Sequence, residues 1–177
     1  MANYDVFGLQ KLEVYDSSTS AWRQIPGVEN ASFEETAETV EVKGDDTIVA
    51  TWRHAQKGEL KWKANIIDFD VLEILTGETA TSETDGGESI PGMTATTLYP
   101  RNLCFRLTQM AKRRSDGEFG TLVTTIYKVQ GFAKVTGQSY GEPSSLEFEG
   151  TALPTDKDEL GQALPKVMGY KQRFIPS

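Results

Sequence analysis

The sequence predicts a mainly β protein with one short helix, built as a single domain. Apolar and polar residues alternate with a period of two over most of the chain, which is typical of strands with one buried face. Only DFDVLEILTG, at 68–77, changes to a helical period, and it ends in glycine. The length of 177 residues matches one domain, and 38% hydrophobic with 25% charged residues is the composition of a folded protein.

The first strands are separated by turn signals. We expect a strand over 9–15, and Pro26-Gly27 is a turn that restarts the chain. In the ribbon that follows, the apolar phase lies on odd positions at Phe33 but on even positions at Val40. Because a strand cannot change phase without a turn or a bulge, we expect a hairpin tip or a strong bulge at 35–38.

The next segment, TIVATWRHAQKGELKWKANII at 47–67, has the clearest strand pattern in the chain. Ile48, Ala50 and Trp52 alternate with Val49, Thr51 and Arg53, and apolar residues alternate with polar ones at 59–66. We therefore expect a β-hairpin that turns near Gln56 to Gly58, with one face in the core.

The helix has recognisable ends. Asp68 or Asp70 can cap its N-terminus, and Gly77 stands where a C-terminal glycine ends a helix. Phe69, Leu72 and Leu75 fall on one side. We expect a helix of about two to three turns.

The C-terminal half returns to strands after a long loop at about 78–100, which lacks periodicity and is expected to be mobile or to make contacts outside its own domain. We expect strands over 103–107, 121–135 and 146–152, with a hairpin connection at 112–120 that contains Asp116-Gly117. In the second strand the predicted core face carries Val123, Tyr127, Val129, Ala133 and Val135. The segment from about 154 to 177 has no clear period and is expected to be a C-terminal arm.

Composition and charge exclude several classes of function. The chain has 18 basic and 26 acidic residues, a net charge of −8 and a pI near 4.8, which disfavours tight binding of nucleic acid or acidic membranes. A single cysteine allows neither an intrachain disulfide nor a cysteine zinc cluster. The N-terminus lacks the positive charge of a signal peptide, and no apolar segment approaches a membrane span, so we expect synthesis in the cytoplasm.

No pattern of residues predicts catalysis. The only histidine, His54, has no nucleophile motif such as G-x-S-x-G to serve, and the expected role of Cys104 is that of a small buried hydrophobe. Neither G-x-G-x-x-G nor a phosphate loop occurs, and the acidic clusters lack the spacing of an EF-hand. We expect no enzyme activity, no cofactor and no metal site.

Charge is concentrated in two places. The ribbon SFEETAETVEVKGDD at 32–46 carries six acids against the single base Lys43. The only dense basic run is Lys112, Arg113 and Arg114. Complementary charge on one small subunit is typical of repeated contact between copies, so we expect this basic run to contact an acidic neighbour or to form a solvated hairpin tip.

The order of these features resembles the major tail tube proteins of long-tailed bacteriophages, whose fold is shared with the tube of type VI secretion. The resemblance rests on the acid-rich ribbon, on GDDTIVATWRHAQKGELKWKANI followed by the helix DFDVLEILTG, and on the long loop and two further β-ribbons. It covers most of Val28 to Leu153. It depends on element order, because this family has no invariant chemical motif.

The resemblance implies a β-sandwich or partial barrel with one flanking helix. It further implies hexameric rings whose inner strands close into one barrel, stacked into a hollow tube in the virion tail that conducts DNA from the capsid to the host. The implied partners are other copies of the chain and tail proteins such as the tape measure and the tail terminator, while DNA passes without specific binding. The long loop and terminal segments favour a non-contractile tail, as in siphophages.

In such a tube, carboxylates facing the lumen would repel phosphate and let DNA slide. The candidates for these positions are Glu34, Glu35, Glu38, Glu41, Glu147 and Glu149. The alternative for these glutamates is a solvated outer face. The alternative for the whole chain is a monomeric β-barrel binding module whose pocket is gated by the loop at 78–97, and particle size in solution distinguishes the two.

Overall fold

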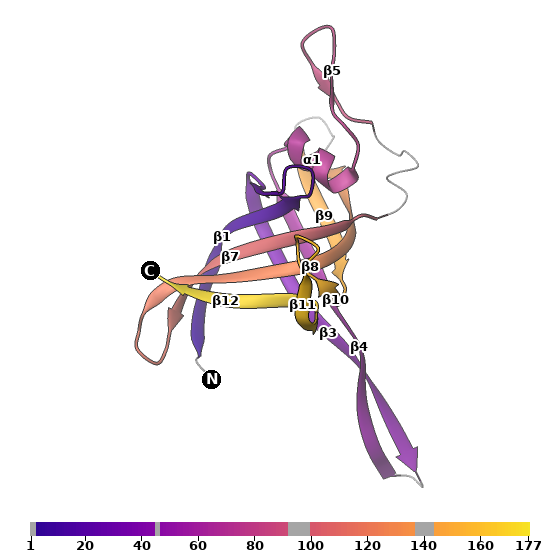
Figure 1. The fold of residues 1–177 in the computed structure, drawn as a ribbon, viewed down its shortest axis with the longest axis vertical. Helices are drawn as coiled ribbons and strands as arrows, with labels where there is room; N and C mark the ends of the chain where they lie inside the picture. Colours follow the sequence, from indigo (N-terminus) through magenta and orange to yellow (C-terminus); the bar gives the residue numbers. More distant parts are fainter. Residues whose placement is uncertain (1–2, 45–46, 92–99, 137–143) are drawn as a thin grey trace.

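The fold is mainly β with one short helix, as predicted, and its main sheet curls into a half-barrel (Figure 1). This computed structural model describes residues 3–44, 47–91, 100–136 and 144–177, and at 37–56 it describes the backbone only. The elements are β1 (Tyr4–Asp16), β2 (Ala21–Gln24), β3 (Val28–Gly44), β4 (Thr47–Ala64), α1 (Phe69–Thr76), β5 (Thr81–Ser82), β6 (Glu88–Ser89), β7 (Asn102–Arg113), β8 (Phe119–Thr136), β9 (Ser145–Ala152), β10 (Thr155–Lys157), β11 (Ala163–Met168) and β12 (Tyr170–Pro176).

The main sheet has the strand order β2-β1-β7-β8-β9-β4-β3, and β12 is a further partner of β8. All of these pairs are antiparallel. Two small sheets, β10-β11 and β5-β6, stand outside it. The short β5-β6 pair lies within the predicted long loop and projects beyond α1 (Figure 1).

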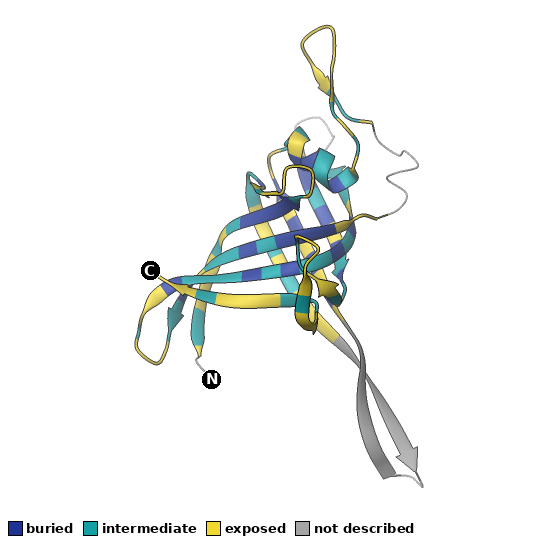
Figure 2. Cartoon of the chain, in the orientation of Figure 1, coloured by how far each residue is buried: buried dark blue, intermediate teal, exposed yellow. Residues whose placement is uncertain are grey.

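The core lies on one face of the curled sheet, and buried residues alternate with more exposed ones most regularly along β9 and the described part of β4 (Figure 2). Its largest fully buried side chains include Phe105 and Phe148, whose ring centroids are 5.1 Å apart. Trp62 stacks on Phe148, with their ring centroids 5.7 Å apart. Cys104 is buried as expected, and burial raises the pKa of its thiol.

The helix forms as its sequence predicts. The Asp68 carboxylate accepts a hydrogen bond from the backbone N–H of Val71 at 3.2 Å, which caps the N-terminus. Gly77 adopts the left-handed conformation, with φ 79°, and ends the helix. The buried side of α1 carries Val71, Leu72 and Leu75, and it packs against β1 and β8.

The ribbon formed by β3 and β4 differs from the prediction. The chain does not turn at Gln56 to Gly58, because β4 runs without interruption from Thr47 to Ala64 beside β3. Gly58 is a strand residue beneath the ring of Phe33, and a Cβ there would lie 2.5 Å from the ring atom Cε2. The register shifts between Ala37 and Glu38, where a bulge was predicted, but the extra residue belongs to β4, between His54 and Gln56, and not to β3. Beyond its pairing with β9, the ribbon projects from the body (Figure 1).

Strand β8 contains a bulge that the sequence did not predict. Leu103 and Phe105 of β7 are two positions apart, whereas their partners Val129 and Ile126 on β8 are three apart. The buried residues therefore change phase, from Thr124 and Ile126 to Val129. The predicted core face is correct from Val129 onward and wrong before it, where Val123 and Tyr127 are only half-buried.

The C-terminal segment is not an arm. It forms β10, β11 and β12, and β12 pairs with β8 from Ile126 to Gly120. The other part of β8, from Val129 to Thr136, pairs with β9. Strands β9 and β12 thus follow one another along β8, and β10-β11 is an excursion between them. Because this segment has no regular period, its three short strands were not predicted from the sequence.

Candidate assembly surfaces

The polar face of β8, β9 and β4 carries lysine and glutamate side chains in register. Lys134, Glu147 and Lys63 are direct neighbours across the three strands, and residues opposite each other in antiparallel strands share a face. Both lysine Nζ atoms lie 3.3 Å from carboxylate oxygens of Glu147. These two hydrogen bonds, that of Lys134 first, lower the pKa of the Glu147 carboxyl.

The next rows continue the same pattern. Lys61 Nζ lies 2.9 Å from Glu149 and 3.3 Å from Glu59. The hydrogen bond from Lys61 lowers the pKa of Glu149, and in return Glu149 and then Glu59 raise the pKa of Lys61. We call the residues Glu59, Lys61, Lys63, Lys134, Glu147 and Glu149 the charge ladder.

The charge ladder changes the predicted role of Glu147 and Glu149. Both were candidates for lumen carboxylates that repel phosphate, with a solvated outer face as the alternative, and each pairs with a lysine of an adjacent strand. The ladder has as many lysines as glutamates. A surface of paired charges neither strongly repels nor strongly attracts a polyanion.

The other glutamate candidates do not share one surface. Glu34 is opposite Glu59 and lies on the ladder face, whereas the adjacent Glu35 lies on the other face. The Glu35 carboxylate accepts a hydrogen bond at 2.9 Å from the hydroxyl of Tyr170. Glu34 and Glu35 therefore do not share one face, because successive residues of a strand point to opposite faces, and a lumen-facing position for some of the candidates stays a prediction. The side chains of Glu38 and Glu41, like that of His54, lie outside the described residues.

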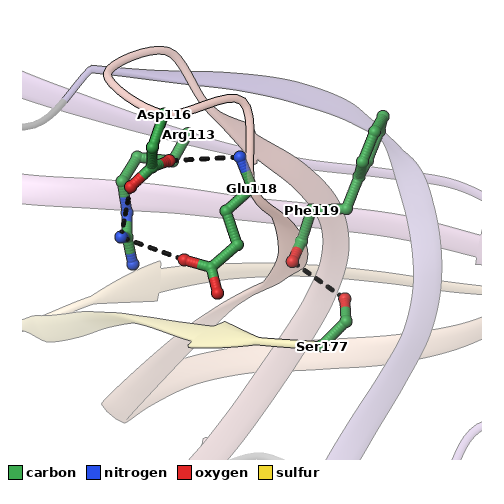
Figure 3. Close-up of polar contacts among 5 residues, drawn as sticks. All are labelled: Arg113, Asp116, Glu118, Phe119 and Ser177. Carbon is green, nitrogen blue, oxygen red and sulfur yellow. Dashed lines mark hydrogen bonds and ion pairs between the residues drawn. The ribbon is translucent and has the colours of Figure 1, made fainter.

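The basic run is mostly engaged within its own chain. Arg113 contacts Asp116 at 2.8 Å and Glu118 at 3.0 Å across the β7-β8 turn (Figure 3). Asp116 also accepts a hydrogen bond from the backbone N–H of Glu118 at 3.1 Å, and this bond and Arg113 lower the pKa of the Asp116 carboxyl. The C-terminus is fixed beside this turn, where the Ser177 hydroxyl donates to the Phe119 carbonyl at 2.8 Å (Figure 3).

The two residues next to Arg113 in the sequence differ in what they contact. Arg114 pairs with Asp5 of β1, with Nε 2.6 Å from the carboxylate. Lys112 has its Nζ 5.1 Å from the ring centroid of Phe119. Among the described residues, Lys112 has no carboxylate partner. A contact between this run and a neighbouring subunit stays a prediction.

A further surface was not singled out from the sequence. It is the face of β1, β7, β8 and β12 opposite the core, and we call it the basic face. Its rows across the strands are Phe7, Met110, Thr121 and Ile175, then Lys11, Thr108, Val123 and Arg173, then Glu13, Arg106, Thr125 and Lys171. These rows can be recognised only from the strand register, because members of one row, such as Phe7 and Ile175, lie far apart in the sequence.

A polar cleft of about 860 Å³ lies between α1, the β1-β2 turn and the turn after β10. Arg23 and Asp70 form an ion pair in its wall, and Arg101 donates to the Ile74 carbonyl at 3.1 Å. In the described part of the chain, no group of three or more histidine, cysteine, aspartate or glutamate side chains is placed to hold a metal ion.

The described residues include no helix that is long and apolar enough to cross a membrane. No model of a known protein family matches the chain, and no curated protein matches it either.

Proposed function

We propose that this chain is a structural subunit that assembles with copies of itself into stacked hexameric rings, forming the hollow tube of a phage tail. In this proposal the tube conducts DNA to the host. Its further partners are other tail proteins, such as the tape measure and the tail terminator. The protein acts in the virion tail after synthesis in the host cytoplasm.

The observation that carries the proposal is the open edge of the half-barrel. Strand β3, with 17 residues, ends the sheet and, among the described strands, pairs only with β4. A long exposed edge invites uncontrolled pairing unless something covers it. A second copy covers it if sheets join side by side, and repetition of one such heterologous contact closes a ring.

The charge ladder supports the passage of DNA by a different means from the one expected. A lumen need not be purely acidic if each lysine that faces it is held by a glutamate. Lys61, Lys63 and Lys134 are paired in this way. Phosphate groups gain little by contacting a lysine whose charge is already compensated, so DNA can slide past.

The cleft beside α1 supports a second candidate, a monomeric ligand-binding module. Its lining includes Gly77 to Thr79, where the predicted gating loop begins. This lining is rich in charged side chains, whereas small-molecule pockets are predominantly apolar. The tube therefore remains the better-supported function.

One experiment separates the two candidates. The purified protein is concentrated stepwise and examined by light scattering after size exclusion and by electron microscopy. The tube proposal expects rings or hollow tubes. A particle of 19.6 kDa under all conditions, including addition of preformed oligomers as seeds, would contradict it and favour the binding module.

A further inference from the structure

The basic face has an unusual charge for this protein. Lys11, Arg106, Lys171 and Arg173 lie in its rows, and Lys112 lies in the adjoining row beside Phe119. Only two carboxylates belong to the same rows, Asp5 and Glu13, and they are held by Arg114 and Lys11. A chain of net charge −8 thus concentrates positive charge on one side of four strands.

The two cations that β12 contributes to this face have no carboxylate partner in the described part of the chain. Lys171 and Arg173 are exposed, and no described carboxylate pairs with either of them. The charge ladder shows that this is not a general property of the sheet. There, each lysine meets a glutamate within 3.3 Å.

An apolar strip adjoins the cations. Phe7, Met110 and Ile175 belong to one row and are 45%, 42% and 40% exposed, and Phe119 in the adjoining row is 51% exposed. Large apolar side chains that gather on one surface beside charged groups mark a contact site. Protein interfaces combine an apolar centre with a polar rim in this way.

We propose that the basic face binds an acidic surface of a second copy of this chain. The inference rests on the proposed self-assembly and names one of its contact surfaces. Part of the protein's positive charge is concentrated on the basic face. The remaining surface of every copy is therefore more acidic than the net charge of −8 indicates. Opposite charges on two surfaces of the same subunit give a heterologous contact that repeats from copy to copy.

Nucleic acid is the competing occupant. It fits the cations, but the molecule as a whole has a net charge of −8 and repels phosphate. The apolar strip also has no counterpart in a phosphate backbone. A protein surface can contact both the cations and the apolar strip of the basic face.

The first test reverses two charges at exposed positions. The double variant Lys171→Glu/Arg173→Glu should keep the far-UV spectrum and melting temperature of the unmodified protein, because both side chains are solvated. Its assembly should require about tenfold more protein, since repulsion replaces attraction at the contact. The matched control Lys157→Glu/Lys166→Glu makes the same change in net charge on the exposed β10-β11 hairpin and should assemble at nearly the normal concentration.

The second test identifies the partner directly. A mixture of isotope-labelled and unlabelled copies is treated with a carbodiimide, which joins lysines to carboxylates in contact. Lys112 and Lys171 should be linked to carboxylates of the other copy. Lys11 is the internal reference, because its Nζ lies 2.6 Å from Glu13 of its own chain. Links from Lys112 and Lys171 confined to their own chain would contradict the inference.

The outcomes separate the two proposals. If the unmodified protein assembles and Lys171→Glu/Arg173→Glu assembles equally well, the basic face is not a contact surface, while the tube proposal stands. If the unmodified protein forms neither assemblies nor links between copies, both proposals are wrong. Binding of a short DNA duplex that is lost in the double variant would assign the face to a polyanion in place of a second copy.

Discussion

At the scale of single residues, the centre of the sheet depends on two glycines that face each other. Gly131 of β8 and Gly150 of β9 are direct partners, and the Phe148 ring occupies the space beside both. A Cβ on Gly131 would lie 2.3 Å from the Glu149 carbonyl oxygen. These contacts involve backbone, which cannot rotate away as a side chain does, so the position has room only for hydrogen.

Replacing Gly131 by alanine should therefore destabilise the protein by about 1–3 kcal/mol, the usual cost of adding atoms to a packed core. Denaturant unfolding of the variant and the unmodified protein measures this difference. Gly8→Ala is the control, because no atom lies within 4 Å of its Cβ position. Equal unfolding midpoints for Gly131→Ala and Gly8→Ala would show that β8 and β9 are not packed this closely.

At the scale of elements, β12 is connected to two separate parts of the sheet. Its backbone pairs with β8, and its first residue, Tyr170, reaches β3. The Tyr170 ring lies 5.2 Å from that of Phe33, edge to face, and its hydroxyl donates to Glu35. The C-terminal strand thereby links the end of the sheet path to its middle and holds the curl.

The Tyr170 hydroxyl gives this link a pH dependence. The hydrogen bond to Glu35, together with burial, raises the pKa of Tyr170 above its usual value of 10.0. The stabilising contribution is fully present below pH 10.0 and is lost as the pH rises through the raised value. Tyr170→Phe keeps the ring and should cost about 0.5–1 kcal/mol at neutral pH. Unfolding free energies compared from pH 7 upward should converge in the alkaline range, and a constant difference would contradict the role of the hydroxyl.

Elements defined by local signals could be predicted from the sequence. The cap at Asp68 and the terminal glycine Gly77 act within one helix, and the turn at Asp116-Gly117 acts within one hairpin. The turn predicted at Gln56 to Gly58 is wrong, because we interpreted glycine as a turn residue. In the structure Gly58 instead leaves room for the ring of Phe33 on the partner strand. The deciding contact comes from another strand and leaves no trace in the local pattern.

The candidate surfaces were less predictable for the same reason. Glu147 and Glu149 were correctly placed on the polar side of their strand. Their lysine partners on β4 and β8 depend on the register of two other strands. The bulge in β8 lies where that strand changes partner from β12 to β9, and the period of β8 alone does not contain this information.

At the scale of the whole molecule, the protein separates its charge into two faces with different properties. The charge ladder is balanced, so it presents little net field to a passing polyanion. The basic face has unpaired cations beside an apolar strip, which suits a lasting contact. The proposed tube would need both kinds of surface on each subunit, one that binds its neighbours and one that does not bind the DNA.

Removing the glutamates of the ladder tests this division. In tubes of Glu147→Gln/Glu149→Gln, the lysines Lys61, Lys63 and Lys134 lose these partners while the side-chain shapes are kept. If the ladder faces the lumen, these tubes should retain DNA at low salt at least about tenfold more strongly than unmodified tubes, and retention should fall steeply with salt because counterions are released on binding. Filter retention of labelled DNA over a salt series measures the effect.

Two further variants make the result specific. Glu83→Gln/Glu88→Gln makes the same change in net charge on the exposed β5-β6 hairpin and should leave retention unchanged. Adding Lys63→Gln and Lys134→Gln to the glutamate variant should restore passage, because the cations that hold phosphate are then removed. Tubes of Glu147→Gln/Glu149→Gln that assemble normally and retain no more DNA than unmodified tubes would place the ladder outside the lumen, since bare lysines along a channel cannot fail to bind a polyanion at low salt.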